Sequence, residues 1–207
     1  NINENKDEYP KALEYFEQAL TIYNEISDLE GQAQVQSNIG VIYRKLGNYD
    51  QAMTYFMNAL QIQGNLQDDR RIASLKMSIA FTYINQAEGD LSLDSLAHRY
   101  LSEVESMDVL NEDLNLKLSL NNYMGLIYKA AQDHDTAIKY YQRAADVSVA
   151  LGKSPAIPIQ NMAVAYMSKG DYEKALEMAK EVLQMKREIG KRSSIGYTLD
   201  LYAKTYL

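Results

Sequence analysis

A short pattern that returns five times along this chain of 207 residues constrains its fold more than any other feature. Each copy has an apolar or aromatic residue, then Gly or Ala, then Tyr three residues later. The tyrosines of the five copies are Tyr43, Tyr83, Tyr128, Tyr166 and Tyr206. Near-regular self-similarity of this kind is typical of a repeat architecture, in which each copy is one supersecondary unit. It also explains why the composition is biased to 17 Tyr, with 3 Phe and no Trp.

A second motif follows each of the first four copies at a similar distance, and one further example precedes them. Its clearest examples are Ala52, Tyr55, Phe56 and Ala59, then Ala137, Tyr140, Tyr141 and Ala144, and an earlier Ala12, Tyr15, Phe16 and Ala19, with weaker copies at 97–104 and 175–182. Apolar residues spaced three and four apart form one face of a helix. Turn residues such as Gly47 separate the segments. The sequence therefore predicts an all-α chain of about ten helices, paired as antiparallel hairpins without a sheet.

The two motifs together resemble the tetratricopeptide repeat. In that family the first helix carries an apolar residue, Gly or Ala, and Tyr; the turn carries Gly and Tyr; and the second helix carries Ala, an aromatic residue and Ala. The places that match in order are Ile39, Gly40, Tyr43, Gly47, Tyr49, Ala52, Phe56 and Ala59. The copies are longer than the usual length of about 34 residues, and Gln36 stands where the family has Trp. The resemblance implies a right-handed superhelical solenoid of helix hairpins.

The repeats predict one solenoid domain over residues 1–207. Its parts are a half repeat at 8–28, repeats at 31–68, 70–110, 113–152 and 155–190, and a half repeat at 192–207. The incomplete ends indicate a fragment of a longer protein, and we expect the stripe of Tyr15, Phe16, Ala19 and Tyr23 to be partly exposed. The third copy has five extra residues near Asp90–Ser95, so we expect a longer and more mobile turn there.

Few residues are suited to catalysis or to binding a metal. The chain has no Cys, which excludes disulfides, thiol nucleophiles and zinc sites built on Cys. The two histidines, His98 and His134, have no neighbours with the spacing of metal ligands, and no glycine-rich phosphate loop is present. Between a metal or acid–base site and a packing role for His134 beside the turn, the packing role is favoured. We therefore expect no enzyme activity, no cofactor and no metal.

Charge and hydropathy limit the partners. The net charge of −7 argues against nucleic acid binding within this segment. No apolar run approaches the ~20 residues that a membrane-spanning helix needs. The compartment is left open: the cytoplasm is favoured, and a signal peptide on the full-length protein would indicate the periplasm.

Charge is also distributed unevenly within the repeats. The expected first helices, at 33–45, 71–86, 115–130 and 157–168, contain six Lys or Arg and no Asp or Glu. The resemblance implies that these helices line the concave face. That face is then neutral to basic on an acidic protein. Cations in the last turn of a helix also favour the helix dipole, which is a structural explanation for Arg44, Lys45 and Lys129.

The resemblance also indicates which first-helix residues face a ligand. These groove residues are Gln34, Ser37, Asn38, Val41, Arg44, Lys45, Met77, Phe81, Ile84, Asn122, Leu126, Lys129, Gln160, Asn161, Val164 and Met167. Amide side chains can pair with both N–H and C=O of an extended peptide, and a basic rim favours acidic groups. Chaperone-binding members use a Lys/Asn/Arg clamp, of which only Asn38 and Asn161 are present, so that partner is not expected.

The function that this pattern favours is a non-enzymatic module that binds a protein or an extended peptide in its concave groove. Long-repeat members of similar appearance are found as the sensory part of bacterial signalling proteins. Two alternatives are a peptide-pheromone receptor that acts on a response regulator, and a structural scaffold for complex assembly. The sequence does not indicate the identity of the ligand or the oligomeric state.

Overall fold

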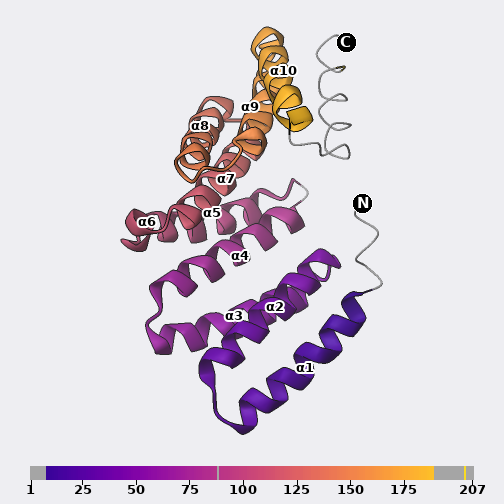
Figure 1. Ribbon diagram of the computed structural model, residues 1–207, viewed down its shortest axis with the longest axis vertical. Coiled ribbons are helices and arrows are strands. Elements are labelled where there is room, and N and C mark those ends of the chain that lie inside the picture. The colour runs from indigo at the N-terminus through magenta and orange to yellow at the C-terminus, as the bar shows by residue number, and fades with distance from the viewer. Residues whose placement is uncertain (1–7, 88, 189–202, 204–207) are drawn as a thin grey trace. The chain divides into compact units, whose positions relative to one another are not determined.

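The computed structural model describes residues 8–87, 89–188 and 203, and the regular secondary structure in these ranges is helical (Figure 1). Within them lie ten helices and no strand. The helices are α1 (Tyr9–Glu25), α2 (Leu29–Lys45), α3 (Tyr49–Leu66), α4 (Asp69–Ala87), α5 (Leu91–Glu105), α6 (Val109–Glu112), α7 (Leu114–Ala130), α8 (His134–Ala150), α9 (Ala156–Lys169) and α10 (Tyr172–Glu188). The prediction of an all-α chain is confirmed for this part of the sequence.

Six of the nine connections between the described helices share one device. A residue in the left-handed region is followed by Asp or Asn, which caps the next helix. Examples are Gly47 (φ 79°) before Asn48 and Gln132 (φ 61°) before Asp133. The cap side chain accepts a backbone N–H of the first turn, as Asp133 does from Thr136 at 3.0 Å. A positive φ is readily adopted by Gly but strains residues that carry a side chain. The capping side chain pairs with a backbone N–H that the first turn of the helix leaves without a partner.

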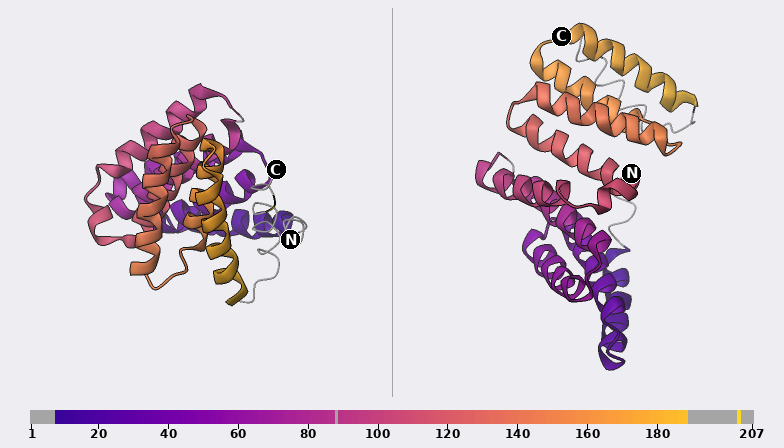
Figure 2. Two further views of the ribbon diagram at one scale, coloured as in Figure 1. Left: turned by 90° about the horizontal axis from the view of Figure 1, so that it is seen from above. Right: turned by 90° about the vertical axis from the view of Figure 1, so that its left-hand side faces the viewer.

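Successive helices pack as antiparallel hairpins (Figures 1 and 2). The paired helices are α2 with α3, α4 with α5, α7 with α8, and α9 with α10. The contacts divide the chain into two compact units, Asn1–Val109 and Leu110–Leu207. In unit 1, α1 also packs on α2 and α3 on α4; in unit 2, α8 packs on α9.

The α2–α3 and α7–α8 hairpins each close on a glycine of the first helix that faces the second helix. A Cβ added at Gly40 would come within 2.8 Å of the Phe56 ring, and one added at Gly125 would also overlap the ring of Tyr141. Both rings are fully buried. The motif residues therefore set the distance between the two helices of a hairpin, as the repeat pattern predicts.

The repeated tyrosines stack on one another across three hairpins. Tyr43 lies 5.6 Å from Tyr55, and Tyr128 lies 5.4 Å from Tyr140, centroid to centroid, with nearly parallel rings. The remaining pair joins Tyr83 and Tyr100 at 6.2 Å. The first-helix tyrosines of these pairs are half-buried and pack against the hydrophobic clusters. These three stacked pairs account for six of the 17 tyrosines.

The expected longer turn in the third copy is wrong. The extra residues lengthen the two helices instead: α4 continues four residues past Tyr83, whereas α2 continues two past Tyr43. At its other end, α5 begins six residues before Ala97, whereas α3 begins three before Ala52. Residues 91–95 are helical, so the reason for expecting mobility there is absent.

Two further predictions concern the ends of the sequence. The half repeat at 192–207 lies outside the described residues except for Ala203. Away from the ends, the structure also contains the short helix α6, which the repeat pattern does not predict. Part of the α1 stripe is exposed as expected: Tyr15 is 59% exposed, whereas Phe16, Ala19 and Tyr23 are half-buried. Among the helices that the structure describes, none combines the length and apolar character needed to cross a membrane.

Candidate functional site

In unit 1 the first helices α2 and α4 form one continuous face. Several contacts join them, among them the Arg44 guanidinium, which lies 4.6 Å from the centre of the Phe81 ring, and Nη1 of Arg71, which donates to Oε1 of Gln34 at 3.2 Å. Gln34 also donates to Asn38, one helical turn away, at 3.3 Å. Amide, guanidinium and aromatic groups from two repeats therefore lie on one surface.

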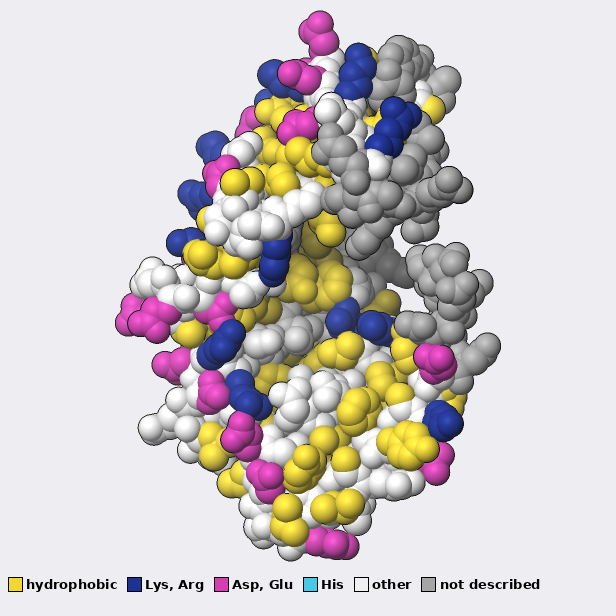
Figure 3. Space-filling model, in the orientation of Figure 1, with side chains coloured by type: hydrophobic (Ala, Val, Ile, Leu, Met, Phe, Trp, Pro, Cys, Tyr) yellow, Lys and Arg dark blue, Asp and Glu magenta, His cyan; other side chains and the backbone are white. Residues whose placement is uncertain are grey.

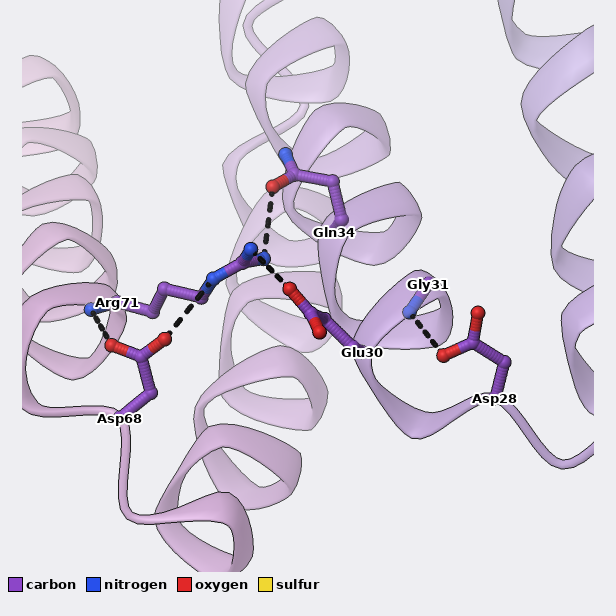
Figure 4. Close-up of polar contacts among 6 residues, drawn as sticks. All are labelled: Asp28, Glu30, Gly31, Gln34, Asp68 and Arg71. Atoms are coloured by element: carbon purple, nitrogen blue, oxygen red, sulfur yellow. Dashed lines mark hydrogen bonds and ion pairs between the residues drawn. The ribbon is translucent and has the colours of Figure 1, made fainter.

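Arg71 of α4 contacts residues of α2 as well as the residue that caps its own helix (Figure 4). Its Nη2 lies 2.5 Å from Oε1 of Glu30 on α2, and its Nε lies 3.2 Å from Oδ2 of Asp68. Asp68 in turn accepts the backbone N–H of Arg71 at 3.0 Å, and so caps α4. One guanidinium is thus shared between two carboxylates, which together outweigh its charge.

These ion pairs correct the expected charge of the first helices. The helices begin earlier than expected, so Glu30 lies within α2 and Asp69 within α4. On α4, Lys76 also pairs with Glu103 of α5 at 2.7 Å. Over unit 1 in Figure 3, Lys and Arg side chains alternate with Asp and Glu along one edge, and hydrophobic side chains gather over α1 and α2. This face of unit 1 is therefore less basic than the windows indicated.

The structure brings most of the expected groove residues of unit 1 to this face. Ser37, Asn38, Val41, Phe81 and Ile84 are half-buried, and Gln34 and Lys45 are exposed. Lys45 lies 5.9 Å from the centre of the Tyr9 ring on α1. Met77 is a correction: it is only 4% exposed, because its side chain is packed in the interior, and it cannot contact a ligand as placed.

In unit 2 the expected groove residues lie on α7 and α9, and all are half-buried. They are Asn122, Leu126 and Lys129 on α7, and Gln160, Asn161, Val164 and Met167 on α9. Some of their amides are already engaged. Asn122 donates to the Leu118 carbonyl at 3.1 Å, and Gln160 accepts a hydrogen bond from Lys186 of α10. Val164 and Met167 pack against the buried pair of Ala163 and Ala179.

One buried polar residue of unit 1 lies beneath the face formed by α2 and α4 and is not among the residues expected from the sequence. Gln63 of α3 is 2% exposed, and its side chain borders a pocket of about 90 Å³ between α2 and α4. A sequence signal was present: Gln63 lies four residues after Ala59 and seven after Phe56, on the buried face of α3. A polar residue in an apolar stripe is unusual enough to mark a site.

Nothing in the described part of the chain forms a metal site, since no group of three His, Asp or Glu side chains has suitable geometry there. Oγ of Ser102 lies 3.4 Å from Nδ1 of His98, one turn apart on α5. His134 is the first residue of α8, where the other repeats have Tyr49 and Tyr172. Both positions fit structural roles.

Comparison with known proteins identifies the family. A model of the tetratricopeptide repeat matches residues 1–65 and 116–188. The chain belongs to the tetratricopeptide repeat family. Members of this family generally mediate interactions between proteins and are typically not catalytic. A search of the curated proteins finds no match.

Solved structures show the same solenoid of helix hairpins. BtubC from P. vanneervenii has a TM-score of 0.75 at 18% identity, over 99% of this chain and 84% of that one. A signal transduction ATPase with a tetratricopeptide repeat sensor from Pyrococcus horikoshii has a TM-score of 0.71 at 19% identity, over 92% of this chain and 30% of that one. Kinesin light chain-like repeats from Podospora anserina have a TM-score of 0.68 at 15% identity, over 88% and 89%. At these identities the likeness shows the fold.

Proposed function

We propose that this tetratricopeptide repeat protein binds an extended peptide segment of a partner on the face formed by its first helices. The observation that carries this proposal is the continuity of that face in unit 1, where Arg71 reaches Gln34 and Arg44 covers Phe81. A surface that offers amides, a guanidinium and apolar side chains together suits a peptide, because it matches both backbone and side chains.

The partner's backbone would be held by amides, and its approach would be guided by cations. Each unit offers such an amide on a first helix: Asn38 in unit 1 and Asn161 in unit 2, both half-buried. Arg44, Lys45 and Lys129 lie in the last turns of α2 and α7. Charges at a rim mainly change association rates, whereas buried hydrogen bonds mainly change dissociation rates. The paired Arg71 and Lys76 contribute less to this attraction than free cations would.

We further propose that binding serves as the sensory input of a larger signalling protein. The structural likeness to a signal transduction ATPase that has a tetratricopeptide repeat sensor supports this role, because the chain aligns over 92% of its length with 30% of that protein. A regulatory protein needs a surface that recognises one segment reversibly, and solenoids provide an extended surface for that purpose.

The test is a selection of short random-sequence peptides on the immobilised protein, followed by binding kinetics of the selected peptide. Asn38→Ala should speed dissociation by about fivefold, since one lost amide hydrogen bond costs about 1 kcal/mol. Lys45→Glu, on the same helix, should slow association and weaken its dependence on salt.

Matched controls lie on the second helices. Asn58→Ala on α3 and Lys139→Glu on α8 change exposed residues of the same types and should leave both rate constants unchanged. If the second-helix variants alter binding and the first-helix variants do not, the proposed face is wrong. If no peptide is selected, peptide recognition is wrong.

A further inference from the structure

The pocket around Gln63 has features of a built site for a polar side chain. Ser37 of α2 and Ser74 and Arg71 of α4 line it, together with the apolar Ala33 and Leu75. Its volume of about 90 Å³ is several times the roughly 10–15 Å³ that one water needs. The pocket therefore has room for the end of a side chain.

No hydrogen bond joins the side-chain amide of Gln63 to another described residue, although the residue is 2% exposed, so the amide is available to a group that enters the pocket. Buried amides are normally paired, because an unpaired one costs free energy. The equivalent position in the α7–α8 repeat is Ser148, which is also buried, but its hydroxyl donates to the Ala144 carbonyl at 2.9 Å. The unpaired amide is thus a property of this pocket and not of the repeat.

The charges beside the pocket select against an anion. Arg71 is the cation that lines it, and Glu30 and Asp68 both pair with Arg71. A carboxylate entering the pocket would meet a guanidinium whose charge is already outweighed by two acids. It would also offer only acceptors, and so leave the Gln63 carbonyl unmatched.

A carboxamide meets each of these requirements. It is neutral, and it donates and accepts at once, so it can form a reciprocal pair with Gln63 while the hydroxyls of Ser37 and Ser74 satisfy its remaining positions. We infer that this pocket takes the carboxamide side chain of an Asn or Gln in the bound peptide. The inference rests on the proposed function for its peptide, but the pocket can be tested without one.

The test is a titration of the isotope-labelled protein with propionamide, and separately with propionate and propylamine, followed by amide NMR shifts. Propionamide should shift the Gln63 side-chain NH₂ signals and the Ser37 and Ser74 backbone signals saturably. Its midpoint should lie at least about tenfold below that of the two charged analogues, since a site built for paired hydrogen bonds rejects groups that leave it unmatched. Gln63→Leu should abolish the response.

Two further variants keep the result interpretable. Gln61→Leu changes an exposed glutamine two residues away and should leave the titration unchanged. If Gln63→Leu does not fold, Ser74→Ala, on the exposed side of the pocket, should raise the propionamide midpoint. Saturable binding of propionate at equal or lower concentration, or no saturable shift with propionamide, would overturn the inference. Neither result would affect the peptide selection, which tests the proposed function separately.

Discussion

Gly40 and Phe56 fit together across the α2–α3 hairpin so closely that a Cβ on Gly40 would lie 2.8 Å from the Phe56 ring. The equivalent residues of the other hairpins are Gly125 with Tyr141, Ala80 with Leu101, and Ala163 with Ala179, all buried. At these equivalent positions Gly is combined with an aromatic residue, and Ala is combined with Leu or Ala. The sizes at the two positions compensate each other.

This compensation predicts coupling between the two positions in unit 1. Gly40→Ala should lower the free energy of unfolding by about 1–3 kcal/mol, because the added methyl group overlaps the ring. Phe56→Leu should also destabilise, because it leaves a cavity. The double variant recreates the Ala80–Leu101 combination, so it should lose at least about 0.5 kcal/mol less than the sum of the single changes. Urea unfolding of the four proteins measures the coupling; strict additivity would contradict it.

The Tyr141 hydroxyl forms no hydrogen bond within the described residues, although the residue is fully buried. Burial raises the pKa of the Tyr141 phenol well above its ordinary value. Tyr141→Phe should therefore stabilise the fold by about 1 kcal/mol, and Phe56→Tyr should destabilise it, since burying an unpaired hydroxyl is unfavourable. Thermal unfolding checks both; a destabilised Tyr141→Phe would reveal a partner for the hydroxyl.

A third prediction concerns the backbone strain at the residue of positive φ that precedes a capping Asp or Asn. Gln132 has φ 61°, and its equivalent in the α2–α3 hairpin is Gly47, with φ 79°. Gln132→Gly should raise the free energy of unfolding by about 0.5–1 kcal/mol, because it relieves a conformation that costs a side-chain-bearing residue roughly 1–2 kcal/mol. Gly47→Gln should have the opposite effect of similar size. Equal stability of both variants and the wild type would show that the turns are not strained.

The aspartate caps predict acid sensitivity. The backbone N–H of Thr136, followed by its hydroxyl, holds the pKa of Asp133 below its ordinary value, and the Lys174 ammonium is the main cause of a lowered pKa at Asp171. A carboxyl whose pKa is depressed on folding stabilises the protein above its ordinary pKa of about 4, and this stabilisation is lost as the pH falls through the lower folded value.

Replacing both caps by Asn separates charge from capping. Asn can still accept the capping hydrogen bond, as Asn48 does from Gln51. The variant Asp133→Asn with Asp171→Asn should therefore lose less stability than the wild type between about pH 6 and about pH 3. Denaturant unfolding at several pH values measures this difference. Identical losses would mean that these two carboxyls do not contribute to acid unfolding.

The repeat spacing was enough to predict the hairpins, because motif residues such as Ala52 and Phe56 set contacts within one hairpin. The predictions that failed depend on neighbouring repeats or on where a helix begins. Caps at Asp28 and Asp68 start α2 and α4 early enough to bring Glu30 and Asp69 into them. Met77 is buried by packing that spacing alone does not reveal, and the pocket at Gln63 needs three helices to meet.

The central claim, that a peptide binds across the first helices, is tested most directly by mapping the selected peptide onto the isotope-labelled protein. Backbone amide shifts and hydrogen exchange should change along the exposed positions of α2 and α4, or of α7 and α9. The signal of Asn38 should change in the first case, and that of Asn161 in the second. The second-helix positions Asn58 and Lys139 should remain unchanged. Changes confined to α3, α5, α8 or α10 would contradict the account, because the partner would then bind the opposite face of the repeats.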